Sequence, residues 1–178
     1  MNAESVLKGF RKEFGSKIKD ITIQKVPNSL KKKLFAERIW FSVGRKHLHS
    51  AVEYLCRTYP DPHFAVCSGY DTGKEIELLY HFTVNYGVRA GEITITMRVM
   101  LPKNDLQTDT ITDLIPGAII SEREMQEMLG IKVKDIPDSR RLFLDDTFPR
   151  GVFPWRKDET GPDKIARNVH AARKGGMK

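Results

Sequence analysis

The chain has only two cysteines, and they are not close together in the sequence. Cys56 and Cys67 do not form a CxxC pair. An iron–sulfur cluster needs several cysteine thiolates, so two distant residues cannot supply its ligands. Cytosolic thiols are normally reduced, and we therefore expect both residues to be unpaired and buried.

Long hydrophobic runs are missing as well. No window approaches 18 consecutive apolar residues, so the sequence predicts no transmembrane helix. The first residues, MNAESVLKGFRKEFGSK, lack the apolar centre of a signal peptide. We expect the protein to stay in the cytoplasm, where partner proteins can hold it at a membrane.

The sequence also lacks a recognisable catalytic or metal-binding constellation. No glycine-rich phosphate loop follows a predicted strand, and a stand-alone enzyme would have to rely on Cys67 or His81, which have no visible base or orienting partner. The His47-x-His49 pair is expected to face solvent. No histidine has convincing ligand spacing, and the set comprises His47, His49, His63, His81 and His170.

Acidic residues are scarce at both ends, which leaves the net charge of +7 unevenly placed. Residues 1–50 hold 12 Lys and Arg against 4 Asp and Glu, and residues 150–178 hold 8 against 3. The Lys31–Lys33 run is expected to be solvated surface. Basic ends leave open an alternative function, a nucleic-acid-binding α+β protein, although no strand carries exposed aromatics interleaved with Lys and Arg.

What the sequence does contain is a clear alternation of helical and strand patterns. The expected elements are a helix over about 3–15, a helix between Gly44 and Tyr59, a helical turn over 108–114, and strands over 21–26, 38–43, 64–70, 76–86 and 93–101. The last two strands alternate strictly around a Gly87–Gly91 turn, which indicates an antiparallel hairpin. This order predicts an α+β fold, with helices on one face of a mostly antiparallel sheet and an extended C-terminal tail.

The segment from Ser121 onward resembles a short capped helix. Ser121-Glu122-Arg123-Glu124 has the form S-x-x-E of a capping box, and Gly130 fits the left-handed residue that ends a helix. We therefore expect a helix of about two turns whose buried stripe is Met125, Met128 and Leu129. A role for Glu122 or Glu124 as a general acid or metal ligand is less favoured, because no Glu-x-x-His partner follows.

A turn with two adjacent arginines follows this helix. Pro137-Asp138-Ser139 predicts the turn, and Arg140-Arg141 comes directly after it. Each guanidinium can fork onto a carboxylate. Two interpretations stay open: the arginines pair with Asp138, Asp145 or Asp146 of the same molecule, or at least one reaches a neighbouring subunit.

Residues 145–178 cannot form a long helix or a central strand, because prolines and glycines recur throughout them. Yet their apolar residues are too many for a free tail, and they include Phe148, Val152, Phe153 and Trp155. We expect a domain over 1–144 and an extended basic tail over 145–178 that lies on a partner subunit.

These motifs together resemble the 30-kDa subunit of respiratory complex I. Most similar are the short versions in archaeal membrane-bound NiFe hydrogenase and sulfur reductase complexes. The specific resemblance covers about residues 120–158. Ile136 stands where the family has a histidine before Pro-Asp. The residues that carry the resemblance, or that it places at a partner interface, are Glu122, Arg123, Glu124, Gly130, Pro137, Asp138, Arg140, Arg141, Phe153, Pro154, Trp155, Arg156 and Lys157.

The resemblance implies a non-catalytic scaffold subunit in the peripheral arm of a membrane-bound oxidoreductase. Such a scaffold clasps the large catalytic subunit next to the small iron–sulfur subunit, contacts the membrane arm indirectly, and supports electron transfer coupled to ion translocation. It holds no cofactor of its own; iron–sulfur clusters, and in some complexes a NiFe centre, belong to the partners. The implied location is the cytoplasmic face of the membrane.

Overall fold

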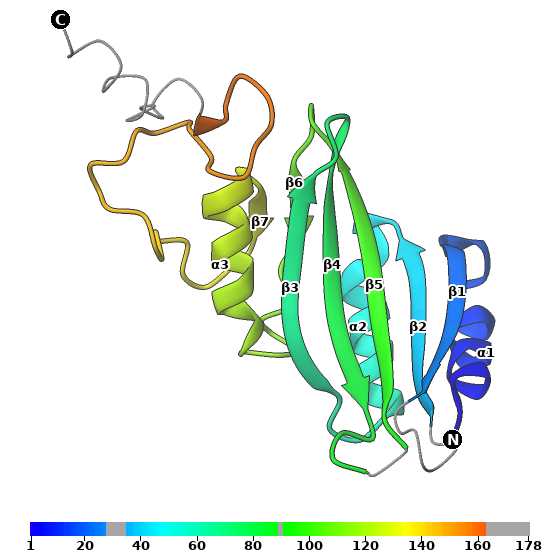
Figure 1. The fold of residues 1–178 in the computed structure, drawn as a ribbon. Coiled ribbons are helices and arrows are strands. Elements are labelled where there is room, and N and C mark those ends of the chain that lie inside the picture. The colour runs from blue at the N-terminus through cyan, green and yellow to red at the C-terminus, as the bar shows by residue number, and fades with distance from the viewer. Residues whose placement is uncertain (28–34, 89–90, 163–178) are drawn as a thin grey trace, which may run out of the picture.

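The computed structural model describes residues 1–27, 35–88 and 91–162. Its main element is a five-stranded sheet in the order β1-β2-β5-β4-β3 (Figure 1). The strands are β1 (Ile18–Pro27), β2 (Phe35–Val43), β3 (His63–Asp71), β4 (Glu75–Val84) and β5 (Ile93–Pro102). Strands β2 and β5 run parallel, whereas the other neighbouring pairs are antiparallel.

The helices cover one face of this sheet. They are α1 (Ala3–Phe14), α2 (Arg45–Thr58) and α3 (Ala118–Leu129), and α3 packs mainly against β3. The alternating residues of β4 and β5 fill the core beneath the helices, and they are Ile76, Leu78, Tyr80, Phe82, Val84, Ile93, Ile95, Met97, Val99 and Leu101. The α+β class, the one-sided helical layer and the β4–β5 hairpin are therefore confirmed.

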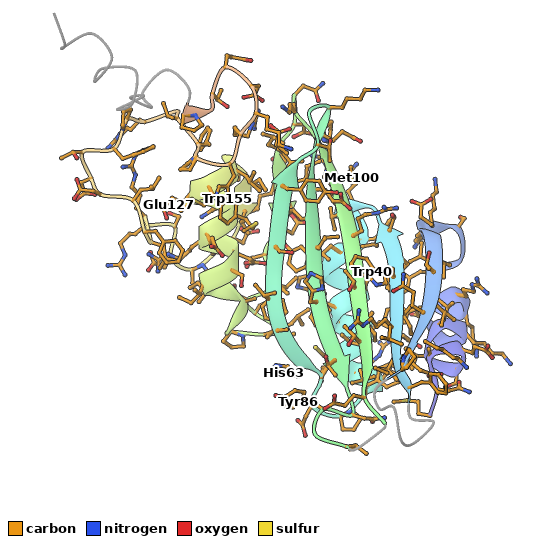
Figure 2. The ribbon with its side chains drawn as sticks, in the orientation of Figure 1. Trp40, His63, Tyr86, Met100, Glu127 and Trp155 are labelled. Carbon is orange, nitrogen blue, oxygen red and sulfur yellow. The ribbon has the colours of Figure 1, made fainter. Side chains whose placement is uncertain are left out.

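The other face of the sheet carries no helix among the described residues. Trp40 and Met100 lie on it, and Figure 2 shows both in front of the strands, with α2 behind. Their neighbours along each strand, such as Phe41 and Val99, are buried on the covered face. None of the described helices has the length and apolar character needed to cross a membrane.

Several small elements complete the fold. A short parallel pair joins β6 (Gln107–Asp109) to β7 (Lys132–Lys134), and a short 3-10 turn, η1 (Gly15–Lys17), follows α1. The predicted helical turn is shorter than expected, because residue 108 belongs to β6 and the turn closes when the amides of Leu114 and Ile115 donate to the Ile111 carbonyl. Residues 135–161 form turns and bends only.

The capping box predicted at Ser121 is wrong. The N-cap of helix α3 is Gly117, four residues before Ser121, and the helix runs for 12 residues, more than three turns. Pro116 sets the start, because its carbonyl accepts from the Ile119 amide in the first turn. Ser121 therefore lies within the helix. The C-terminal end of α3 is as predicted, because Gly130 has a φ of 71°. The predicted stripe of Met125, Met128 and Leu129 is buried.

Candidate partner interface

Glu122 fastens the loop before α3 to the helix. Its side chain is fully buried, accepts from the Thr110 hydroxyl (2.5 Å) and accepts from the Ile111 amide (3.0 Å). Burial raises the pKa of this carboxyl, and the two hydrogen bonds oppose that rise. Glu122 is thus a structural residue inside the domain, and Glu124, two residues on, is only half-buried on the same helix.

Arg123 holds the predicted turn against α3. Its Nε donates to the Arg140 carbonyl (2.9 Å), its Nη2 donates to the Arg141 carbonyl (2.8 Å), and its Nη1 lies 3.3 Å from Asp138 Oδ2. Hydrogen bonds from the Arg140 side chain and amide, with the charge of Arg123, hold the pKa of Asp138 well below its usual range. Pro137, just before, is exposed.

The two adjacent arginines have different partners. Arg140 forks onto Asp138 of the same molecule, through Nε (2.9 Å) and Nη2 (2.7 Å), yet its side chain is 84% exposed. Arg141 Nη1 donates to the carbonyls of Asp145 (2.6 Å) and Phe148 (3.0 Å). The intramolecular interpretation is therefore confirmed for Arg140, whereas Arg141 binds backbone carbonyls rather than carboxylates.

Glu127 on α3 binds the backbone just after the arginines. Its carboxylate accepts the amides of three successive residues: Leu142 (3.2 Å), Phe143 (2.8 Å) and Leu144 (2.8 Å). A row of amides that converges on one anion forms a concave, well-ordered turn. Phe143 itself is 61% exposed, so this carboxylate orders a backbone whose central side chain points into solvent.

Phe153 packs at the C-terminal end of α3, directly over Gly130. A Cβ at position 130 would lie 2.6 Å from two atoms of the Phe153 ring. The residue must therefore be glycine for two reasons, its positive φ and this close approach. The Phe153 amide donates to the Thr160 carbonyl (2.8 Å), which closes the loop of residues 153–160.

A charged cluster then ties this loop to the sheet. Lys103 Nζ lies 2.8 Å from Asp71 Oδ2 and 2.6 Å from Asp158 Oδ2, and the buried Arg156 binds Asp158 through Nη2 (2.5 Å). Burial alone would raise the pKa of Asp71, but hydrogen bonds from Lys103 and two backbone amides lower it below its ordinary value. Two acids thus neutralise two bases where β3 ends.

Arg156, Trp155 and Lys157 complete this attachment. Arg156 Nη1 donates to the Leu129 carbonyl at the end of α3 (3.2 Å), and the Trp155 amide donates to the Met128 carbonyl (3.0 Å). The Lys157 amide donates to Asp71 (2.9 Å), while the Lys157 side chain is exposed. The tail up to Gly161 therefore contacts its own domain, although the boundary at 144/145 stays a prediction.

The same loop leaves an aromatic groove open to solvent. Trp155, labelled in Figure 2, is 41% exposed. With Pro154 and Tyr70 it lines a hollow of about 600 Å³ between β3 and the tail. A smaller cavity of about 180 Å³ lies between the arginine turn and Phe153, next to Glu127. Nothing in the described part of the protein fills either space, and both lie on the α3 side of the molecule.

The candidate catalytic and metal-binding residues stand apart from one another within the parts of the chain that the structure describes. Those parts contain no cluster of three or more His, Cys, Asp or Glu side chains suited to a metal. Cys67 is buried and unpaired, and burial raises the pKa of its thiol. Cys56 is unpaired and half-buried. His81 lies between the hydroxyls of Ser68 and Thr96, and burial lowers its pKa.

The histidines near the start of α2 are only partly solvent-facing. Both His47 and His49 are half-buried, and His49 Nε2 lies 2.8 Å from Asp113 Oδ2. Two further predictions, for the Lys31–Lys33 run and for the tail beyond Pro162, concern residues outside the described part of the chain.

A family model decides the identity of this fold. The model of the family described as "Respiratory-chain NADH dehydrogenase, 30 Kd subunit" matches residues 41–164, a span that includes most of the sheet, α3 and the anchored loop. The chain belongs to this family. The resemblance read from the arginine turn and the proline-rich loop is thereby confirmed.

Relatives from hydrogenases and dehydrogenases share this domain. Membrane-bound hydrogenase subunit beta of Pyrococcus furiosus is 32% identical over 134 residues, which cover 75% of this chain and 77% of the relative. A subunit of the F(420)H(2) dehydrogenase of Methanosarcina mazei is 29% identical over 135 residues, covering 74% and 82%. Formate hydrogenlyase subunit 5 of Escherichia coli is 36% identical over 87 residues, but the match spans only 15% of that longer protein.

Two solved structures share the fold. One belongs to a structure described as the membrane-bound sulfane sulfur reductase, an archaeal respiratory membrane complex; it has a TM-score of 0.63 and 15% identity, with 97% of this chain and 90% of that chain covered. The other, a trypsin-resistant fragment of Nqo5, has a TM-score of 0.55 and 22% identity, with 78% and 99% covered. Both similarities concern the fold alone.

Three residues of the interface gave no signal in the sequence. Glu127, Asp71 and Lys103 each bind groups that are distant in the sequence, up to 86 residues in the case of Asp71 and Lys157. No local pattern marks such contacts. The sequence contained only an indirect indication of such contacts. It predicted that an apolar tail without helix or strand lies on a protein surface, and the buried backbone of such a tail needs hydrogen-bond partners.

Proposed function

We propose that the chain is a non-catalytic scaffold subunit of a membrane-bound, complex I-like oxidoreductase of the hydrogenase or sulfur reductase type. In this proposal it clasps the large catalytic subunit beside the small iron–sulfur subunit and supports electron transfer coupled to ion translocation. It stands on the cytoplasmic face of the membrane and meets the membrane arm only indirectly. The nucleic-acid-binding alternative rested on net charge alone, and family membership outweighs it.

One observation carries the proposal: the segment 138–161 has neither helix nor strand, yet it is fixed to α3 and β3 and holds apolar side chains outward. Arg123 and Glu127 fix its backbone, together with the charged cluster around Asp71, here called the Asp71 cluster. That cluster comprises Asp71, Lys103, Arg156 and Asp158. Phe143 and Trp155 remain exposed. An ordered loop with exposed aromatics is typical of a protein–protein interface, where aromatic anchors dominate the binding energy.

The relatives support a large partner subunit. One of them, a NADH-quinone oxidoreductase protein of Erwinia tasmaniensis whose name joins two subunits, is 31% identical over 144 residues, and the match spans 23% of its length. A domain of this type is thus continuous with a longer polypeptide in some relatives. We infer that the same neighbour binds this chain non-covalently.

The proposal also assigns no redox cofactor to this chain. The clusters, and any NiFe centre, lie in its partners. Metal analysis and visible absorption of the isolated protein should show no stoichiometric iron or nickel, whereas the complex purified with it should contain iron. Stoichiometric iron in the isolated protein would contradict the scaffold role.

Substitution of Trp155 tests the clasp directly. Trp155→Ala should weaken assembly with the large subunit by about 2 kcal/mol, since buried tryptophans are frequent interface anchors. The melting temperature of the isolated protein should change little, because the side chain lines a solvent-open groove. Recovery of the tagged complex from membranes, with its subunits identified by mass spectrometry, measures assembly. Equal losses of assembly and of stability would show that Trp155 only holds this domain together.

A further inference from the structure

Phe143 combines high exposure with a fixed backbone. Its side chain is 61% exposed, although its own amide and those of Leu142 and Leu144 all bind the Glu127 carboxylate. Glu127 lies on α3, which packs against the sheet. The direction in which the phenyl ring projects is therefore set by a rigid element rather than by a free loop.

The backbone on either side of Phe143 is also secured. On one side, Arg123 binds the carbonyls of Arg140 and Arg141; on the other, Arg141 binds the carbonyls of Asp145 and Phe148. Association loses affinity when loops and side chains must be ordered on binding. A ring on a turn that is already ordered loses little conformational entropy on binding. This arrangement is expected of an interface anchor.

We propose that Phe143 is a docking anchor that inserts into an apolar pocket of the large partner subunit, and that Glu127 is its positioning residue. This inference rests on the proposed function and adds to it a second contact, separate from Trp155. The occupant is a different protein rather than a second copy of this one. Relatives in which the matched region is 15% or 23% of a longer protein support such a neighbour.

Tyr86 provides a matched control. It is 62% exposed, almost the same as Phe143, but it lies in the loop between β4 and β5, away from Glu127 (Figure 2). A photo-crosslinking amino acid is placed at position 143 or at position 86 of the tagged full-length protein, and the complex is purified from membranes and irradiated. Position 143 should crosslink to the large subunit, and position 86 should not.

Affinity gives an independent measurement. Phe143→Ala should weaken binding to the large subunit by about 30-fold, as for a typical anchor, while Tyr86→Ala should change it less than about 3-fold. Both side chains are mostly exposed in the isolated protein, so neither variant should alter its melting temperature appreciably. An unchanged affinity for Phe143→Ala would overturn the proposal.

Glu127 is tested through its coupling to Phe143. Glu127→Ala removes the acceptor of three amides and should weaken binding through the position of the Phe143 ring. If it acts by positioning the ring, the double variant Glu127→Ala/Phe143→Ala should bind about as weakly as Phe143→Ala alone. Independent, additive losses would show that Glu127 is merely structural and would refute its positioning role.

The outcomes separate this inference from the proposed function. If the complex assembles but position 143 crosslinks to nothing, to a second copy of this protein or to a subunit other than the large one, the anchor is wrong and the scaffold role stands. If the wild-type protein recovers no large subunit at all, the proposed function fails and the anchor fails with it.

Discussion

At the scale of single residues, Gly130 shows how one position can satisfy two constraints. Its φ of 71° ends α3, and the Phe153 ring occupies the space where a Cβ would stand. Gly151 has a similar φ of 79°, but nothing lies within 4 Å of its Cβ position. Comparing the two glycines therefore separates backbone strain from steric overlap.

Gly130→Ala should lower the free energy of unfolding by about 2–4 kcal/mol, because left-handed strain adds to overpacking against Phe153. Gly151→Ala should cost about 1 kcal/mol from strain alone. Urea unfolding of both variants measures the difference. Equal costs would mean that the Phe153 ring moves aside without loss.

Glu122 predicts a dependence of stability on pH. Because burial raises its pKa above the ordinary 4.5, the folded protein binds this proton more tightly than the unfolded protein does. The stabilisation from the protonated form is complete below about 4.5 and is lost as pH rises through the folded pKa. Glu122→Gln keeps an acceptor for the Ile111 amide and removes the titration.

The stability of Glu122→Gln relative to the wild type should therefore increase as pH rises above about 4.5. Chemical unfolding at about pH 4 and about pH 8 measures this change. A difference between the two proteins that stays constant over this range would show that the carboxyl has an ordinary pKa in the folded state.

At the scale of elements, the folded domain extends beyond residue 144, because residues 145–161 contact α3 and β3. A protein truncated after residue 144 loses the Arg156 bond to the Leu129 carbonyl and leaves the buried Asp71 with fewer partners. Unpaired buried groups cost about 1–3 kcal/mol each. We expect this truncated protein to unfold cooperatively, with a melting temperature lower by about 5–15 °C, and to fail to assemble.

A protein truncated after Pro162 is the matched control. It keeps every contact described for residues 145–161, so its melting temperature should equal that of the full-length protein. Calorimetry of the two truncated proteins tests both expectations. If the shorter one is as stable as the longer one, the Asp71 cluster contributes nothing to folding, and the predicted boundary at 144/145 marks an independent domain.

The contrast between the strands and α3 explains what the sequence could predict. Strand periodicity is local, so the alternating residues of β4 and β5 predicted both the hairpin and its buried face. The capping box at Ser121 failed because Pro116 and Gly117 start the helix earlier and because distant Thr110 binds Glu122. Glu127 could not be found, since its three amides lie 15 to 17 residues away.

At the scale of the whole molecule, two parts of the protein have different expected roles. The ordered loops carry neutralised charges, such as Arg140 with Asp138, and exposed aromatics. The sequence beyond Pro162 is strongly basic, because residues 163–178 hold five Lys and Arg against one Asp. Charges at the rim of an interface mainly affect the association rate.

Neutralising basic residues beyond Pro162 should therefore lower the association rate and leave the dissociation rate nearly unchanged. Arg167, Arg173 and Lys174 replaced together by Gln should lower the association rate with the partner subunits at about 50 mM salt. At about 300 mM salt the association rates of the variant and the wild type should converge, because screening removes the steering that the tail provides.

The dissociation rate should stay nearly constant, since it depends on aromatic anchors such as Trp155. Kinetic binding measurements at both salt concentrations test this. A faster dissociation of the triple variant at high salt would show that the tail is itself buried in the interface.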